Sequence, residues 1–318
     1  MALITVRSLT RDAEHFLKHK RTLGYAYHRN AFTLRSFLLY AAAQAGARER
    51  IDLPRMLRVW LARSPGRKPI SVAAELGTLR QFFLFRRRSD PAAFVPDSTW
   101  APPSTGAAFL PHVPTYDDVC RLIQLAMSTR DPLRARTLCT LLIVLYCTGL
   151  RPGEAARLEL TDIDLQARSF HIRESKGKTR FVPFGEDLAE VLRAYLRMRA
   201  GVARSTEDGP LFVQPDGRAV SVPAAMNAVR QLLRRCRLKP PRGRVGPRAY
   251  DLRHAFAVHR LAAWYHAGVD IHSRLPWLSA YMGHDNLLGT EVYLSATAEL
   301  LALAAERFER RYRGERSR

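Results

Sequence analysis

A proline-rich stretch in the first half of the chain limits how this sequence can fold. Six prolines lie between Asp90 and Pro114, mixed with Ser, Thr and Gly. Proline removes a backbone donor and favours extended chain, so a helix or a central strand is not expected to continue through such a segment. We therefore predict a linker over residues 91–114, preceded by one domain over 1–90 and followed by a second over 115–318.

The first domain is predicted to be all-helical. From about Leu9 to Arg88, apolar residues recur at helical spacing with Lys and Arg between them. The pattern breaks at the Ser-Pro-Gly of residues 64–66, and a further helix is expected from about Ser71 to Arg87. The apolar positions are Phe16, Leu17, Leu23, Phe32, Leu34, Phe37 and Leu38 before the break and Leu76, Leu79, Phe82 and Phe83 after it.

The chain is strongly basic, and its positive charges are spread along it. The 51 Lys and Arg exceed the 29 Asp and Glu, which gives a formal net charge of +22. Such a charge attracts polyanions, and its spread favours a long nucleic-acid footprint over a basic tail. Arg86, Arg87 and Arg88 end the last helix of the first domain, where they form either a solvated helix end or phosphate contacts.

The second domain is predicted to be mainly helical with a small β-sheet, an α+β fold. Thr115 followed by acidic residues resembles a helix N-cap, and two helices are expected from there to about Leu150. Two β-prone runs, at 169–173 and 180–184, surround a Gly-containing turn and indicate a hairpin. The remaining sequence has the pattern of helices and ends in a basic tail.

The cysteines and the apolar runs give no sign of a metal site or a membrane segment. The four cysteines form no Cys-x-x-Cys pair, so we expect no zinc and no disulfide framework, which fits a reducing cytoplasm. The most apolar run, Leu138–Leu150, is shorter than the roughly 20 residues that span a bilayer. The N-terminus lacks the long apolar stretch of a signal peptide. We expect a cytoplasmic chain without a membrane partner.

Two segments in the first half of the second domain carry residues suited to phosphate chemistry. Residues 148–154 place Arg151 at a Gly/Pro break after an apolar helix, where its guanidinium either points at a phosphate or pairs with Glu154. The hairpin turn carries Lys176 and Lys178, which either reach into a DNA groove and donate a proton or are simply solvated.

Three more segments lie toward the C-terminus. They are Tyr-Asp-Leu-Arg-His at 250–254, the Gly-His pair that ends at His284, and Thr-Glu-Val-Tyr-Leu at 290–294, whose Tyr293 follows His284 by nine residues. A single tyrosine on a helix is usually a packing residue, and a lone histidine after glycine is usually structural. The order and spacing of all five segments are far more specific than any one of them.

Together the five segments resemble the tyrosine recombinase, or phage integrase, family over essentially the whole second domain. Residues 1–90 are similar, through less specific motifs, to the helical, SAM-like core-binding domain of that family, which contacts DNA. The resemblance implies a site-specific recombinase that cuts and rejoins double-stranded DNA for the integration or transposition of a mobile element. It implies a homo-oligomer on DNA, a tetramer, with related recombinases as further partners. It implies neither a cofactor nor a metal.

The resemblance also implies a role for each matching residue. Arg151 and Arg253 clamp the scissile phosphate and stabilise the pentacoordinate transition state without a metal. Lys176 protonates the departing 5′ oxygen. Tyr293 attacks phosphorus and forms a 3′-phosphotyrosyl bond, and His284 hydrogen-bonds the phosphate.

The sequence departs from the family pattern at Tyr250, where the family commonly has a histidine three residues before the arginine. A phenol can donate a hydrogen bond to a phosphate, but its ordinary pKa of about 10 makes it a poor base. Tyr250 is also an alternative nucleophile, ranked below Tyr293 because the nine-residue offset from His284 fits Tyr293. The hairpin turn is tight, so Lys178 is an alternative acid. The stretch from Arg253 to His284 is longer than in Xer-type recombinases and resembles integrases of mobile elements.

Other functions are compatible with these residues. One is a DNA-binding relative that no longer cuts, which the tyrosine at position 250 keeps open, and another is an Xer-type resolvase. A type IB topoisomerase shares the chemistry but is disfavoured by the compact linker and the lack of extra domains. The predicted helix at 298–309 either packs on its own domain or docks on a neighbouring protomer.

Overall fold

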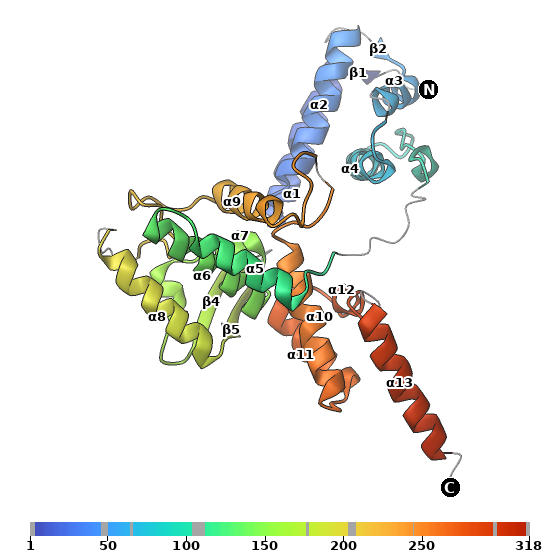
Figure 1. Ribbon diagram of the computed structural model, residues 1–318. Helices are drawn as coiled ribbons and strands as arrows, with labels where there is room; N and C mark the ends of the chain where they lie inside the picture. Colours follow the sequence, from blue (N-terminus) through green and yellow to red (C-terminus); the bar gives the residue numbers. More distant parts are fainter. Residues whose placement is uncertain are drawn as a thin grey trace. The chain divides into compact units, whose positions relative to one another are not determined.

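The structure is a computed structural model in which the chain divides into two compact units, Met1–Phe109 and Leu110–Arg318 (Figure 1). It describes residues 4–45, 50–63, 66–103, 112–175, 178–202, 208–243, 245–294 and 298–315.

In the described part of the first unit, four helices pack around an aromatic core. The helices are α1 (Val6–Thr22), α2 (His28–Ala45), α3 (Leu53–Ala62) and α4 (Pro69–Arg87). Phe16, Phe37 and Trp60 are among the side chains that this core buries completely. Strand β1 (Ile4–Thr5) pairs antiparallel with β2 (Arg50–Ile51), so the all-helical prediction is wrong at this point. Two strands of two residues each leave no alternation that a sequence pattern could reveal.

Part of the proline-rich segment packs on the first core. Phe94 and Trp100 lie against this core, with ring centroids 5.7 Å apart, and Phe94 also contacts the ring of Phe83 edge-on. A short 3-10 helix, η1 (Ser98–Trp100), begins at Asp97, whose side chain accepts from Thr99 N–H. The described start of the predicted linker is therefore ordered by apolar contacts, although proline prevents it from extending α4.

The second unit begins as its sequence predicts. Helix α5 (Tyr116–Met127) starts at Thr115, whose side chain and that of Asp118 form a reciprocal capping box. Helix α6 (Pro132–Thr148) is buried on nearly all sides and contacts α5, α8 and α10. The predicted hairpin is confirmed as β4 (Ser169–Ser175) and β5 (Lys178–Pro183), and β3 (Ile163–Asp164), which was not predicted, adds a third antiparallel strand.

The remaining helices complete two apolar clusters. They are α7 (Pro152–Ala155), α8 (Glu186–Ala200), α9 (Val222–Arg235), α10 (Asp251–His266), α11 (Ile271–Met282), α12 (Leu288–Glu291) and α13 (Ala298–Glu315), with η2 (Leu160–Asp162) before β3. One cluster joins α5, α6, α8 and α9 to the sheet. The other joins α10, α11 and the start of α13, where Leu300 is buried. The predicted fold class, mainly helical with a small sheet, is confirmed.

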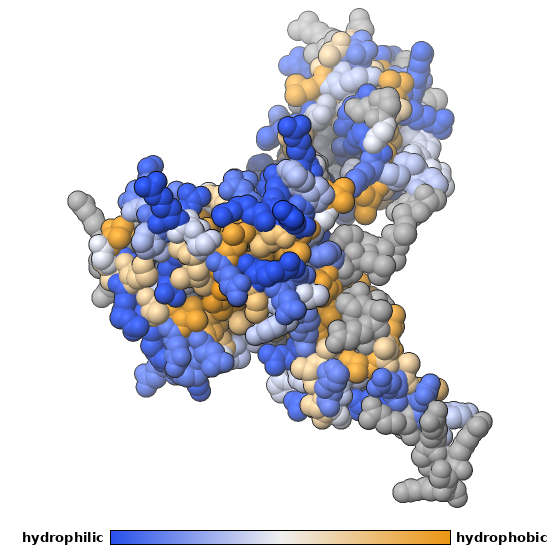
Figure 2. All heavy atoms as spheres, in the orientation of Figure 1, coloured by the Kyte–Doolittle hydropathy of each residue, from blue (hydrophilic) through white to orange (hydrophobic). Residues whose placement is uncertain are grey.

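The surface of each unit agrees with the composition. Figure 2 shows hydrophilic side chains over much of the visible surface of both units, as a formal net charge of +22 requires. None of the helices within the described ranges is long and apolar enough to cross a membrane. Helix α13 packs on α10, and Arg307 Nη1 donates to the Val269 carbonyl at 2.6 Å, whereas Leu301 and Phe308 are exposed.

Candidate active site

Two helices of the second unit end in left-handed glycines whose carbonyls face the same region. Helix α6 is capped by Gly149, with φ of 60°, and α11 by Gly283, with φ of 68°. A Cβ at Gly149 would lie 2.3 Å from Phe256 Cδ1, and one at Gly283 would lie 2.8 Å from Arg180 Cζ. The backbone conformation therefore favours glycine at both positions, and at Gly149 the Phe256 ring leaves no space for a side chain.

Arg253 is fully buried and held by two backbone carbonyls. Its Nη1 donates to the Gly149 carbonyl at 2.6 Å and its Nη2 to the Met282 carbonyl at 2.7 Å. Burial lowers the pKa of Arg253, but an arginine starts so high that its guanidinium stays charged. Among the described residues no carboxylate forms an ion pair with it. The fork is thus fixed in place without being neutralised.

Arg151 is held beside it by a carbonyl and a carboxylate. Its Nη2 donates to the Gly283 carbonyl at 2.6 Å and its Nη1 to Glu154 Oε1 at 2.7 Å. The Glu154 side chain is 1% exposed and also accepts from Arg180 Nη2 at 2.9 Å. The predicted pairing of Arg151 with Glu154 therefore exists together with an anchored fork. The consecutive carbonyls of Met282 and Gly283 bring the two arginines to one place.

Tyr293 lies buried next to this pair of arginines. It follows α12, is 2% exposed, and its hydroxyl oxygen is 3.1 Å from His254 Nδ1. Burial raises the pKa of Tyr293, while Arg253 and, more weakly, Arg151 lower it. The imidazole of His284 stacks near the Tyr293 ring, with centroids 6.1 Å apart. The phenol is therefore neutral near pH 7 and lies where the positive charge of both arginines reaches it.

Two histidines surround the phenol, and the sequence assigned a role to one. His284 Nδ1 lies 2.7 Å from Thr290 Oγ1, which fixes the orientation of its ring. His254 lies within the quoted 250–254 segment, and its position one residue after Arg253 is the signal that could have singled it out. Its Nε2 is 3.6 Å from Asp251 Oδ1. Tyr250 is 37% exposed and its ring meets the His254 ring edge-on at 5.1 Å.

The other predicted residues belong to the hairpin turn and to the first unit. Lys176 lies outside the described residues, and of Lys178, the first residue of β5, only the backbone is described. In the first unit, Arg86 pairs with Asp12 at 2.8 Å, and Arg87 Nε donates to the Ala93 carbonyl at 3.3 Å. Arg88 lies 5.9 Å from the Phe85 ring centroid. DNA contact by these residues stays a prediction.

A basic groove of about 810 Å³ opens beside Arg151 and Tyr250. Its lining includes the exposed Arg157 and Arg230. It also includes Lys239, whose Nζ donates to the Val245 carbonyl at 2.7 Å; burial lowers the pKa of Lys239. The charge of this groove suits a polyanion that approaches the buried arginines.

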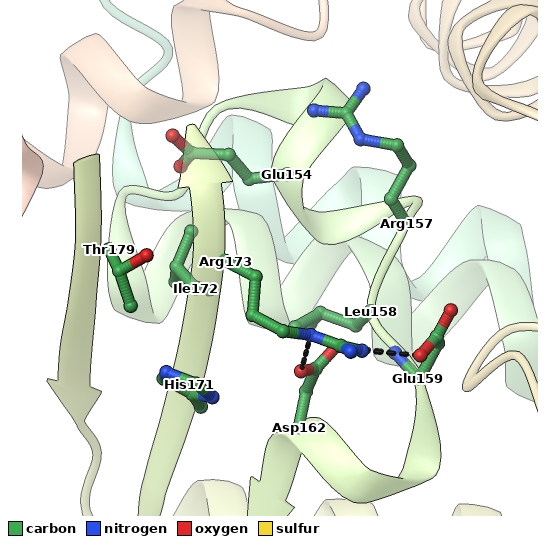
Figure 3. Close-up of a pocket in the computed structure, with 9 residues that line it drawn as sticks. All are labelled: Glu154, Arg157, Leu158, Glu159, Asp162, His171, Ile172, Arg173 and Thr179. Atoms are coloured by element: carbon green, nitrogen blue, oxygen red, sulfur yellow. Dashed lines mark hydrogen bonds and ion pairs between the residues drawn. The ribbon is translucent and has the colours of Figure 1, made fainter. Parts of the chain in front are cut away.

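A second hollow, of about 560 Å³, lies between α7 and the sheet. Figure 3 shows Arg173 extending from β4 toward Asp162 and Glu159, with Glu154 and Arg157 at the other end of the hollow. Arg173 Nε pairs with Asp162 Oδ1 at 2.7 Å. Glu159 and Asp162 are both paired with Arg173, and Tyr293 and Arg253 do not line this hollow. Over the described ranges, no group of three His, Cys, Asp or Glu side chains is placed to hold a metal ion.

Comparison with known proteins shows the family of the chain. The sequence matches the phage integrase family over residues 114–299. It is 32% identical over 310 residues to a Sinorhizobium fredii protein named "Putative integrase/recombinase y4rB", covering 94% of this chain and 96% of that one. It is 33% identical over 230 residues to the tyrosine recombinase XerA of Thermococcus kodakarensis, covering 72% of each chain.

The fold also has a solved counterpart. The integrase of the transposon Tn1549, in complex with transposon right-end DNA, superimposes with a TM-score of 0.67 at 15% sequence identity. That match covers 96% of this chain and all of the other. Since the sequence match spans more than half of the chain and a full-length relative exceeds 30% identity, the chain belongs to the phage integrase family of tyrosine recombinases, enzymes that cut and rejoin DNA strands.

Proposed function

We propose that this enzyme carries out site-specific recombination through a covalent 3′-phosphotyrosyl intermediate on Tyr293. One observation carries the proposal: a buried phenol lies beside two guanidiniums that consecutive backbone carbonyls already hold in place. Fixed donors of this kind stabilise charge as it develops on the phosphoryl oxygens, because they need no reorganisation during the reaction.

In the proposed reaction, the Tyr293 oxygen attacks phosphorus and the bond to the 5′ oxygen breaks. Lys176 gives a proton to that leaving oxygen, and His284, oriented by Thr290, hydrogen-bonds the phosphate. The phosphotyrosyl ester keeps the energy of the broken bond. The 5′ hydroxyl of a partner strand can therefore attack it and restore a DNA strand without ATP. Tyr250, at the position where the family commonly has a histidine, donates a hydrogen bond to the phosphate.

We further propose that the substrate is the end of a mobile element. The Sinorhizobium fredii relative matches almost the whole of both chains, whereas the Xer-type relative XerA matches 72% of each. The resemblance of the long segment between Arg253 and His284 to mobile-element integrases supports the same assignment. Integration or transposition is therefore favoured over chromosome resolution.

The proposed DNA path follows the positive charge. In the second unit it enters by the basic groove with Arg157 and Arg230, and Lys178 of the hairpin contacts a DNA groove. In the first unit, which we propose is the core-binding domain over residues 1–90, Arg86, Arg87 and Arg88 lie at the end of α4. Phosphate contacts of this kind fix the register of a protein on the duplex.

We propose that the protein forms a tetramer on DNA. Helix α13 supports this proposal because it exposes apolar side chains in addition to those that it buries in its own unit. Leu300 is buried, but Leu301 and Phe308 are 52% and 67% exposed. An exposed apolar helix face is a surface for a neighbouring protomer. Related recombinases with the same surface can join such an assembly.

The test is a covalent trapping experiment. A pool of duplexes with a randomised core and a nick near the cleavage point is incubated with the full-length chain, and the DNA in protein adducts is sequenced. We expect a defined core sequence, an adduct resistant to denaturation, and no adduct with Tyr293→Phe. Sequenced junctions from intact duplexes then report integration, excision or resolution.

Two matched variants separate the alternatives. If Tyr293→Phe still traps DNA and Tyr250→Phe does not, the nucleophile is Tyr250. If the wild type binds duplexes with a steep salt dependence and never forms an adduct, the chain is a DNA-binding relative that does not cut. Adducts without any sequence preference, together with relaxation of supercoiled DNA, indicate a type IB topoisomerase.

A further inference from the structure

The nucleophile needs a group that takes its proton, and the residues above leave this role open. A phenol with an ordinary pKa of about 10 is neutral near pH 7, and burial raises the pKa of Tyr293 further. The family's usual histidine is here Tyr250, which is itself a phenol. His284 lies with its Nδ1 on Thr290 and its ring stacked beside the tyrosine.

His254 contacts the reacting oxygen. Its Nδ1 is 3.1 Å from the hydroxyl oxygen of Tyr293, and both side chains are buried, at 8% and 2% exposed. A candidate base must lie within hydrogen-bond reach of the proton that it removes, and this distance meets that requirement. The contact joins α10 to the turn after α12.

Asp251 lies at the other nitrogen of the same imidazole. The distance from Asp251 Oδ1 to His254 Nε2 is 3.6 Å, and the carboxylate also accepts from Arg248 N at 2.8 Å and Nη2 at 3.0 Å. The Asp251 oxygens are the acceptors of these bonds, and an acceptor beside Nε2 favours a ring hydrogen on that nitrogen, so we assign the hydrogen to Nε2. The Nδ1 lone pair then faces the phenol.

We propose that His254 is the general base for Tyr293 and that Asp251 orients it, in a phenol–imidazole–carboxylate arrangement. The Tyr293 O–H bond breaks, its proton moves to His254 Nδ1, the phenol oxygen bonds to phosphorus, and the bond to the 5′ oxygen breaks. Asp251 stabilises the resulting imidazolium. In rejoining, His254 returns the same proton to the Tyr293 oxygen as it leaves phosphorus. This inference rests on the proposed function.

The groups around His254 fit this cycle. From α10 and the segment before it come Asp251, Arg253, Arg248 and Tyr250, and Tyr293 faces it from the turn after α12. Burial lowers the pKa of His254, with Arg248 and Arg253 in the same direction and Asp251 opposed. The imidazole is therefore neutral near pH 7, which is the form that accepts a proton.

The deciding experiment changes the acidity of the nucleophile. Tyr293 is replaced, in the full-length chain, by a ring-fluorinated tyrosine whose hydroxyl ionises more readily. The assay is single-turnover cleavage of the nicked duplex that carries the selected core sequence. When residue 293 is the natural tyrosine, His254→Asn lowers the cleavage rate by about 10²-fold or more. With the fluorinated tyrosine the same substitution costs less than about tenfold, because an ionised nucleophile needs no base. Asparagine keeps a polar atom near the Nδ1 position without its basicity.

The matched control is His259→Asn on the same helix. His259 Nδ1 also lies on a tyrosine hydroxyl, that of Tyr146, at 2.8 Å, but this pair is not part of the site. We expect its cleavage rate to stay within about threefold of the wild type with either nucleophile. An equal loss for His254→Asn with both nucleophiles, or no loss, overturns the proposal.

A second variant keeps the test valid if His254→Asn does not fold. Asp251→Asn removes the group that raises the pKa of His254, so the rising limb of the cleavage rate against pH moves to lower pH. If the rising limb of the pH profile stays at the same pH in Asp251→Asn, His254 is not the general base. If the wild type forms no adduct at all, the proposed function fails instead, which separates the two outcomes.

Discussion

The two units of this chain bury different kinds of side chain. Among the described residues of the first unit, the buried polar side chains are Thr33 and Thr78, within a core built of rings. The second unit buries ions and their partners, namely Glu154, Asp162, Arg199, Lys239, Asp251, Arg253 and His254. Buried charge is costly unless it is paired or hydrogen-bonded. The first unit therefore depends on apolar burial for its stability, whereas the second carries an electrostatic cost. Arg253 and His254 place part of that cost beside Tyr293, as expected of a site that does chemistry.

Of the substitutions that test this difference between the units, Arg253→Lys is expected to reduce the cleavage rate most. A lysine cannot donate to the carbonyls of both Gly149 and Met282 in the geometry of a planar fork, and it offers the phosphate a mobile charge. Single-turnover cleavage of the nicked duplex is expected to fall by about 10³-fold, while circular dichroism keeps its helical signal.

The control for Arg253→Lys is another buried arginine. Arg199 is 4% exposed and donates its Nε and Nη2 to the Pro210 carbonyl, outside the site. Arg199→Lys is expected to leave cleavage within about threefold. If both variants lose the same share of the cleavage rate, both arginines serve folding. The buried charge of the second unit would then not be explained by catalysis.

Glu154→Gln is expected to have the next largest effect. The amide has one acceptor oxygen where the carboxylate has two, and it carries no charge, so two partly buried guanidiniums lose their shared counter-charge. Cleavage is expected to fall by about 10²-fold and the free energy of unfolding by about 3 kcal/mol, since one partner of a buried pair is removed. Asp162→Asn is the matched acid-to-amide control, because Asp162 is buried against Arg173 away from Tyr293. Losing cleavage equally in both would contradict the positioning role of Glu154.

The sequence predicted those features whose signals are local. The helix N-cap at Thr115 and the pairing of β4 with β5 each lie within a few residues and are confirmed. The pairing of β1 with β2 joins residues 4–5 to 50–51, which no local pattern reveals. Likewise, the start of the predicted linker packs on the first core because Phe94 and Trp100 find apolar partners there.

At the candidate site, the resemblance of the five segments to the family selected both arginines, His284 and Tyr293, and the structure brings these residues together. The contacts that hold them were not predictable. Arg180 reaches Glu154 across 26 residues of chain, and His254 meets Tyr293 across 39. The first contact joins β5 to α7 and the second joins α10 to the turn after α12, so both appear in the folded chain alone.

Phe37→Leu tests the first unit, with a smaller effect. Phe37 is fully buried and meets the Trp60 ring edge-on at 5.5 Å. Losing this ring contact is expected to lower the free energy of opening of the first unit by about 1.5 kcal/mol, measured by hydrogen exchange of α1 to α4. At saturating DNA the cleavage rate is expected to stay within about twofold. The matched change in the second unit, Phe256→Leu, removes the ring beside Gly149 and is expected to slow cleavage. If Phe37→Leu slows cleavage, the first unit also affects the chemistry, and the difference drawn between the two units is wrong.

The smallest expected effect is a pH dependence of stability that comes from His254 in the second unit. Burial lowers the pKa of His254, while His15, His19 and His28 of the first unit are not buried. The unfolded chain takes up a proton at an ordinary histidine pKa of about 6.5, and the folded chain does so at a lower pH, so protons favour unfolding between these two values. Stability from this source is therefore complete above about pH 6.5 and declines as the pH falls toward the lowered pKa. Hydrogen exchange of α10, corrected for intrinsic rates, should show opening become easier over this range in the wild type and less so in His254→Asn. A wild-type and a variant curve of equal slope would show that the imidazole titrates alike in the folded and unfolded chain, and the buried histidine would then carry no electrostatic cost.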